Sequence, residues 1–284
     1  MNNSAETQAL RTGLVTELKA QGYVKSGAVE EALGRVPRHL FIPWRKPEDA
    51  YRGTEGAIVD PETTPETCST VSQPIAVAMM LEGFDVKPGM QVLEIGAGSG
   101  YNAALLAHLA GEHGKVVTVD LEDFLVEKAR RQLATVGFGQ VEVVCGDGAL
   151  GYPPGAPYDR IVATVGLPEI PPAWLEQLAP GGKIAVPLHI GGEPRDHVLV
   201  SLEVRDGYLE GVGLGSLGMV LFRSQSARYG EEVTRRWGAA WHGAKTDELK
   251  ITIYPAAADV PLEPQQLQIR KPDSVTVLER LESG

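Results

Sequence analysis

The sequence predicts an α/β protein with a doubly wound, mostly parallel sheet, preceded by helices and followed by a β-rich extension. Two observations support this prediction. Between residues 74 and 187, short apolar runs of strand length alternate with segments whose apolar residues recur at helical spacing, and the connections are short. A glycine-rich turn follows the first of these strands, which is typical of open α/β sheets that bind a ligand at their carboxyl edge.

The N-terminal part contains helices and then a long loop. Residues 4–35 are predicted to be helical because leucines recur at helical spacing, with a break at Gly22. Pro37 ends this region, since the residue before a proline disfavours helical geometry. Residues 43–70 are rich in Pro, Glu, Thr and Gly, which predicts a surface segment of the kind that often serves as a lid.

The central part carries the alternating pattern. Strands are expected at residues 91–95, 115–119, 141–144, 158–163 and 183–187, with a turn at Gly181-Gly182 before the last. Helices are expected at residues 74–84, 101–109, 125–136 and 172–178. Because strand and helix alternate, the strands should lie parallel, with the helices on both faces of the sheet.

Beyond residue 190 the pattern changes to short strand-like pieces. An Asp206-Gly207 pair predicts a hairpin between residues 198–204 and 208–210. Further strand-like pieces occur at residues 249–254 and 275–278. We therefore expect one α/β domain over residues 1–190 and an α+β accessory region over residues 191–284.

Composition narrows the possible partners and the location. The chain carries 26 Lys and Arg against 37 Asp and Glu, a formal charge of -11, so we expect no nucleic-acid partner. No stretch approaches 18 apolar residues and no secretion signal is present, which favours a cytoplasmic protein without membrane contact. Cys68 and Cys145 share no metal-ligand spacing and the six histidines form no cluster, so we expect no metal centre.

One group of basic residues near the N-terminus stands out against the acidic background. Its members are Arg35, Arg38, Arg45 and Lys46. They could form a local site for an anionic substrate, but a solvated face is the interpretation that the sequence favours.

The glycine-rich turn is the first candidate site. The expected strand at residues 91–95 runs into a G-x-G-x-G sequence formed by Gly96, Gly98 and Gly100, and then into a helix. Glycine is needed where backbone must turn sharply and approach a ligand without a Cβ in the way. The turn therefore predicts a ligand lying directly against the backbone.

Acidic residues end the next two strands. Asp120 lies 20 residues after Gly100, where a carboxylate would reach ribose hydroxyls. Gly146-Asp147-Gly148 ends the third strand and places a carboxylate near the expected position of an adenine ring. These positions indicate a cofactor that contains adenosine.

The choice of cofactor lies between NAD and S-adenosyl-L-methionine. The turn has G-x-G-x-G spacing rather than G-x-G-x-x-G, and Glu94 precedes its first glycine by two residues. A pyrophosphate would be repelled by that carboxylate, whereas a ligand with an amino group and a sulfonium would tolerate or use it. We therefore expect S-adenosyl-L-methionine, with S-adenosyl-L-homocysteine as its product.

The segment V-L-E-I-G-A-G-S-G-Y-N-A-A resembles the first motif of Rossmann-like class I methyltransferases, and closely that of the protein-L-isoaspartate O-methyltransferase family. Three further segments resemble the same family: Val36 to Pro43, Thr70 to Pro74, and Pro168 to Pro171 followed by Gly181-Gly182. The resemblance runs from about residue 10 to 190.

This resemblance implies a carboxyl O-methyltransferase that acts on an aspartate-derived carboxylate of a peptide or protein. It implies that Ser72, with Thr70 nearby, lies where methyl donor and acceptor meet, although Ser72 could also cap a helix that begins at Pro74. The implied cofactor contacts are Glu94, Gly96, Ala97, Gly98, Gly100, Asp120, Leu121, Gly146, Asp147, Gly148 and Thr164.

Two departures from the family leave the acceptor open. Cys68-Ser69 stands where the family commonly has Gly-Gln, and the loop at residues 51–72 is longer than usual. The region beyond residue 190 is the second departure. Ile170 to Trp174, Leu178 to Gly182 and, within that region, Met219 to Arg223 are similar to a branch of the family that methylates an Asp in lanthipeptide, lasso peptide or graspetide precursors. Isoaspartyl repair and precursor tailoring both remain open, as do a non-catalytic nucleotide-binding module and a small-molecule methyltransferase. Nothing indicates the oligomeric state.

Overall fold

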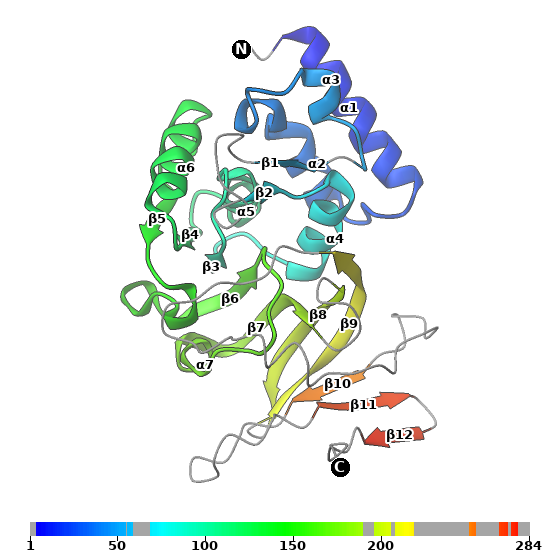
Figure 1. Ribbon diagram of the computed structural model, residues 1–284, viewed down its shortest axis with the longest axis vertical. Coiled ribbons are helices and arrows are strands. Elements are labelled where there is room, and N and C mark those ends of the chain that lie inside the picture. The colour runs from blue at the N-terminus through cyan, green and yellow to red at the C-terminus, as the bar shows by residue number, and fades with distance from the viewer. Residues whose placement is uncertain are drawn as a thin grey trace, which may run out of the picture.

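The structure is a computed structural model, and it describes residues 4–54, 56–58, 69–189, 196–205, 208–218, 250–253, 267–271 and 274–277. Figure 1 shows helices gathered around one end of a long twisted sheet, with the N-terminal helices and the last strands at opposite ends of the molecule. Cys68 and Met219 to Arg223, which carried part of the sequence comparison with the family, lie outside the described part of the chain.

One sheet of ten strands runs through the described residues, in the order β12-β11-β10-β9-β8-β7-β6-β3-β4-β5. Its parallel part consists of β3 (Gln91–Ile95), β4 (Lys115–Asp120), β5 (Glu142–Cys145), β6 (Tyr158–Ala163) and β7 (Leu178–His189). The chain moves outward from β3 through β4 to β5 and then returns to β6 on the other side of β3. This reversal is the point at which doubly wound sheets bind ligands, and the predicted fold class is confirmed.

The β-rich extension continues the same sheet with antiparallel strands. They are β8 (Asp196–Arg205), β9 (Tyr208–Gly218), β10 (Lys250–Ile253), β11 (Leu267–Lys271) and β12 (Ser274–Val277). Arg205 pairs with Tyr208, as the predicted hairpin requires. Since β8 and β9 extend the sheet beyond residue 190, the division into two domains stays a prediction.

The turn expected at Gly181-Gly182 is instead an irregularity inside β7. Tyr158 pairs with Leu178, but Arg160 pairs with Lys183, so four residues of β7 bulge out of the ladder. Gly181 adopts a φ of +75°, a conformation that glycine reaches without strain. The strand therefore begins before the glycine pair rather than after it.

Five of the seven described α-helices begin at a side-chain cap or at a proline. Ser4 accepts a hydrogen bond from Thr7 N at 3.3 Å, and Ser26 one from Val29 N at 3.2 Å. The helices are α1 (Ala5–Ala20), α2 (Gly27–Arg35), α3 (Pro47–Ala50), α4 (Pro74–Phe84), α5 (Tyr101–Ala110), α6 (Asp123–Thr135) and α7 (Pro172–Gln177). The short elements are the 3-10 helices η1 (Arg38–Phe41), η2 (Gly148–Leu150) and η3 (Pro153–Gly155) and the strand pair β1 (Ala57–Ile58) and β2 (Thr70–Val71).

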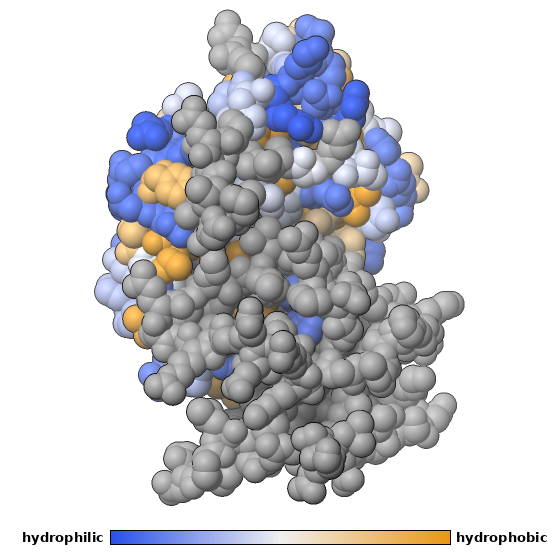
Figure 2. All heavy atoms as spheres, in the orientation of Figure 1, coloured by the Kyte–Doolittle hydropathy of each residue, from blue (hydrophilic) through white to orange (hydrophobic). Residues whose placement is uncertain are grey.

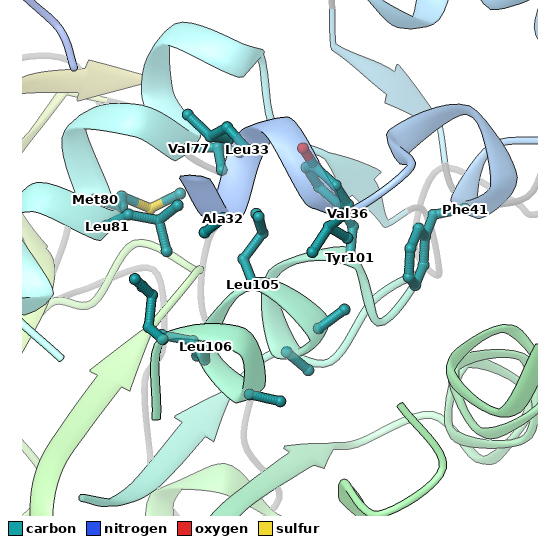
Figure 3. Packing of buried hydrophobic residues seen from close by; sticks show 14 of the residues in the cluster. Ala32, Leu33, Val36, Phe41, Val77, Met80, Leu81, Tyr101, Leu105 and Leu106 are labelled. Carbon is teal, nitrogen blue, oxygen red and sulfur yellow. The ribbon is translucent and has the colours of Figure 1, made fainter. Parts of the chain in front are cut away.

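The core on the α4 and α5 side of the sheet joins the N-terminal helices to the rest of the domain. Figure 3 shows Leu33 of α2 beside Val77 of α4, with Leu105 of α5 close by. Leu105 and Ala32 are fully buried, and a buried leucine contributes about 2 kcal/mol. This packing fixes α4 and α5, which carry the two parts of the candidate site.

Figure 2 shows hydrophilic residues over the N-terminal helices and a few exposed hydrophobic ones near α6 and β5. Among the residues that the structure describes, no helix combines the length and apolar character needed to cross a bilayer. The described residues also contain no group of three potential metal ligands.

Candidate functional site

The glycine-rich turn lies at the carboxyl end of β3, beside the reversal of strand order. Gly96, Gly98 and Gly100 have φ values of +98°, +51° and +84°. Gly96 N donates to Val119 O at 2.8 Å, which ties the turn to the end of β4. A Cβ on Gly96 would lie 2.6 Å from Thr164 Oγ1, so only glycine fits there.

Thr164 holds the turn from the other side. It follows β6 directly, and its hydroxyl donates to Gly96 O at 2.7 Å while its amide donates to Ile95 O at 3.0 Å. The ends of β3, β4 and β6 are therefore joined at the turn, and Ala97 is buried inside it.

Glu94 is fully buried behind the turn. Thr118 Oγ1 donates to its Oε2 at 2.6 Å, and Asn102 Nδ2 donates to its Oε1 at 2.7 Å. Burial raises the pKa of Glu94 from 4.5 to about 7, the two hydrogen bonds oppose this shift, and Asp120 adds to it. Sequence reasoning missed Asn102 and Thr118, although Thr118 shares a face of β4 with Asp120.

Asp120 and Asp147 occupy neighbouring strand ends. Asp120 Oδ2 accepts from Gly98 N at 2.9 Å, and its Oδ1 accepts from Glu122 N at 3.3 Å. Gly146 N donates to Asp120 O at 2.9 Å, which brings the two strand ends together. Asp147 caps η2 by accepting from Ala149 N at 3.0 Å.

Leu121 and Gly148 complete the predicted cofactor residues. Leu121 directly follows Asp120 and is partly buried, and its carbonyl accepts a weak bond from Cys145 Sγ at 3.8 Å. Gly148 is buried, and its carbonyl accepts from Trp174 Nε1 at 2.8 Å. All eleven predicted cofactor residues thus lie at or directly behind the carboxyl edge of the sheet; which of them touch a ligand stays a prediction.

This edge fits an adenosine-containing cofactor. Gly96 and Gly98 are partly exposed, and an ionised carboxylate offers about four acceptor positions. Asp120 could therefore accept from ribose hydroxyls and Asp147 from an adenine amino group. Phe124 and Leu150, which are 37% and 54% exposed, follow these carboxylates closely in the chain and add apolar surface that suits a flat ring.

The predicted acceptor segment precedes α4. Thr70 is exposed and pairs with Ile58 of β1, and Val71 pairs with Ala57. The N-cap of α4 is Gln73, without a side-chain capping bond, so the interpretation of Ser72 as the helix cap is wrong. Pro74 already has no amide hydrogen to satisfy, which removes part of the need for a capping hydroxyl.

Arg38 connects the acceptor segment to the glycine turn. Its Nη2 donates to Ser72 O at 2.9 Å, and its Nε donates to Ala50 O at 2.9 Å. The guanidinium lies 5.1 Å from the ring centroid of Tyr101, the residue that follows Gly100. Arg38 is fully buried, so the interpretation of this basic group as a solvated face is wrong for Arg38.

Comparisons with known proteins identify the class to which this fold belongs. A solved protein-L-isoaspartate O-methyltransferase is 32% identical and superposes with a TM-score of 0.66 over 75% of this chain and 66% of that one, just under two thirds of its length. A Plasmodium falciparum structure, described as such an enzyme in complex with S-adenosyl-L-homocysteine, is 19% identical and superposes with a TM-score of 0.62 over 75% of this chain and 98% of that one. The chain is an S-adenosyl-L-methionine-dependent methyltransferase.

Sequence comparisons define the family. The model of the family described as protein-L-isoaspartate(D-aspartate) O-methyltransferase matches residues 9–211. The Methanopyrus kandleri protein-L-isoaspartate O-methyltransferase is 45% identical over 63% of this chain and 76% of its own length. That of Hyperthermus butylicus is 43% identical over 70% of this chain and 83% of its own length. The chain therefore belongs to the protein-L-isoaspartate(D-aspartate) O-methyltransferase family.

Proposed function

We propose that this chain methylates the free carboxylate of an isoaspartyl residue in a peptide or protein. The observation that carries the proposal is the position of Ser72, whose backbone is tied through Arg38 to the helix that follows the glycine turn. Relatives that are 43 to 45% identical bear the name of this activity.

Methyl transfer to a carboxylate needs no general acid or general base. A carboxylate with a pKa near 4 is ionised at neutral pH and is already a nucleophile. When bound, S-adenosyl-L-methionine supplies an electrophilic methyl group on a sulfonium. One carboxylate oxygen gains a bond to the methyl carbon as the carbon–sulfur bond breaks, and the two opposite charges cancel.

The residues of the chain then have three tasks: binding, orientation and exclusion of water. Asp120 and Asp147 hold the adenosine, and the glycine turn lets the backbone approach the cofactor closely. The Ser72 hydroxyl donates to the acceptor carboxylate and fixes its direction. Such positioning can account for several kcal/mol of the barrier.

The ester prepares the residue for a second, unassisted reaction. A methyl ester is a better acyl group than a carboxylate, so the following backbone amide nitrogen attacks its carbonyl carbon. Methanol leaves and a succinimide ring closes, which later opens by hydrolysis. In this way methylation would return part of the isoaspartyl residues to aspartate.

The C-terminal region favours a second candidate acceptor. The family match ends at residue 211, yet the described sheet continues through β10, β11 and β12. An added region of this size could present one dedicated precursor peptide, whose ordinary Asp would then be the acceptor. The cofactor chemistry would be the same.

Turnover on a matched pair of peptides tests the proposal. A short isoaspartyl peptide and its normal-aspartyl twin are each incubated with labelled S-adenosyl-L-methionine. We expect methylation of the isoaspartyl peptide alone. Cofactor binding with neither peptide methylated would overturn the repair function and favour a dedicated precursor.

A further inference from the structure

One buried side chain, that of Arg38, bonds to both ends of the stretch that precedes α4. Residues 51–71 lie between Ala50, the last residue of α3, and Ser72, and Tyr51 and Val71 at their two ends are buried in the core. The carbonyls of Ala50 and Ser72 both accept hydrogen bonds from the guanidinium of Arg38, each at 2.9 Å. One planar group therefore fixes the two ends of this segment relative to each other.

The neighbouring residue reinforces the first of these ends. His39 Nδ1 and the hydroxyl of Tyr51 are hydrogen-bonded at 2.8 Å, and both side chains are buried. Arg38 and His39 lie in the same 3-10 helix, η1, which packs Phe41 against the ring of Tyr101 at a centroid distance of 5.5 Å. η1 thus contacts the segment on one side and the start of α5 on the other.

The burial of Arg38 has a cost that its bonds to two carbonyls only partly offset. A guanidinium that is fully removed from water loses much of its hydration. Among the described residues no carboxylate forms an ion pair with Arg38, and its counterparts are carbonyls and an aromatic face. A shorter or apolar residue at this position would avoid that cost but could not join three separate elements.

We propose that Arg38 is a positioning residue for methyl transfer, which sets the distance between the acceptor segment and the glycine turn. The inference rests on the proposed role of Ser72 and adds a residue that touches neither donor nor acceptor. Its Nη2 fixes the Ser72 peptide plane, and thereby the direction in which the Ser72 side chain leaves the backbone. The guanidinium of Arg38 also packs against the ring of Tyr101, the first residue after the glycine turn, and fixes its position.

Arg160 offers a matched control. It is also buried, and its Nε donates to Phe84 O at 2.9 Å, so it makes the same kind of bond. It lies near the start of β6, however, at the end of the strand opposite the site. Arg160→Met should therefore cost stability without moving the acceptor segment.

The experiment compares Arg38→Met, Arg38→Lys and Arg160→Met by kcat/KM on the isoaspartyl peptide and by calorimetric Kd for S-adenosyl-L-homocysteine. We expect Arg38→Met to lose about 100-fold in kcat/KM, because a misplacement of about 1 Å costs that much, while the Kd changes less than about threefold. Arg38→Lys keeps the positive charge but lacks the planar guanidinium with its several N–H donors. Its kcat/KM should therefore lie between those of Arg38→Met and the wild type. Equal losses of kcat/KM in Arg38→Met and Arg160→Met would overturn the inference.

Hydrogen exchange separates this inference from the proposed function. In the S-adenosyl-L-homocysteine complex, Arg38→Met should speed amide exchange in residues 69–75, whereas Arg160→Met should speed it in residues 84–91. This result would support the role of Arg38 even if the wild-type protein left the isoaspartyl peptide unmethylated. Unchanged exchange in residues 69–75 of both Arg38 variants would overturn it.

Discussion

The two sides of the candidate site are built in different ways. On the donor side, backbone atoms at neighbouring strand ends bond directly to one another, as Gly96 N does to Val119 O and Gly146 N to Asp120 O. On the acceptor side, separate segments are joined by the side chain of Arg38 and by the short pairing of β1 with β2. Donor geometry therefore follows largely from the sheet, whereas acceptor geometry depends on Arg38 and on one short strand pair. Substitutions on one side should spare the other.

The largest effect is expected from Gly96→Ala on the donor side. The residue has a φ of +98°, and the new Cβ would lie 2.6 Å from Thr164 Oγ1, so the turn must shift. We expect the Kd for S-adenosyl-L-homocysteine to rise by about 100-fold or more, equivalent to about 2.7 kcal/mol. Isothermal titration calorimetry measures this directly.

Gly89→Ala is the control for that prediction. Gly89 also has a positive φ, +86°, but nothing lies within 4 Å of its would-be Cβ. It should lose about 1 kcal/mol of stability from backbone strain and bind the cofactor normally. If the two variants bind equally well, the turn is not the donor site.

Ser72→Ala should give the next largest effect, and on the acceptor side alone. Loss of a hydrogen bond to a charged carboxylate costs about 2 kcal/mol, so kcat/KM on the acceptor should fall about 30-fold. The Kd for S-adenosyl-L-homocysteine should stay the same, and Thr70→Ser, which keeps its hydroxyl, should stay close to wild type. A parallel loss of cofactor affinity would mean that the two sides are not separable.

Asp120→Asn should weaken cofactor binding about tenfold, because the amide keeps one acceptor oxygen but loses the charge. Asp159→Asn is its counterpart at the other end of the sheet, where Asp159 Oδ2 accepts from Gln91 N at 2.8 Å. The control should leave the Kd unchanged while lowering stability. Binding that is insensitive to Asp120→Asn would remove this carboxylate from the site.

The smallest effect concerns the charge of Glu94. If its carboxylate attracts the sulfonium, Glu94→Gln should weaken S-adenosyl-L-methionine a few-fold more than S-adenosyl-L-homocysteine, which lacks that charge. The same selective weakening should appear in the wild type as the pH falls below about 7 and Glu94 becomes protonated. If the ratio of the affinities for S-adenosyl-L-methionine and S-adenosyl-L-homocysteine stays unchanged, the Glu94 carboxylate is too far from the sulfonium to attract it.

The raised pKa of Glu94 should also make the free energy of unfolding depend on pH. The Glu94 pKa is about 7 in the folded chain and near 4.5 when unfolded, so between these values the folded state binds more protons. The free energy of unfolding of the cofactor-free protein should then fall as the pH rises through this window, by about 3 kcal/mol in total. Glu94→Gln should lack that decline in urea titrations. Equal slopes would show that the pKa of Glu94 is not raised.

The sequence predicted the elements whose signals are local. Helix α4 and strands β3 and β6 have the predicted bounds, since their apolar runs are flanked by proline, glycine or turn residues. Every predicted cofactor residue lies at the strand ends because strand order alone brings those positions together.

Other features depend on contacts that are distant in the sequence. The burial of Arg38 requires Ala50, Ser72 and Tyr101 to come together around it, which no local pattern indicates. The bulge at Gly181 depends on pairing with β6, and β11 was missed because its residues, Leu267 to Lys271, are partly charged. The acceptor side, built from such contacts, was accordingly the less predictable one.

The chemical nature of the transferred methyl group tests the central claim most directly. Labelled methyl groups are transferred to the isoaspartyl peptide, the peptide is isolated, and the pH is raised. Carboxyl methylation predicts that the label leaves as volatile methanol, because the ester yields to hydroxide or to the backbone amide. Label that stays on the peptide through alkali would mean methylation of nitrogen or of an ether oxygen, and would contradict the account.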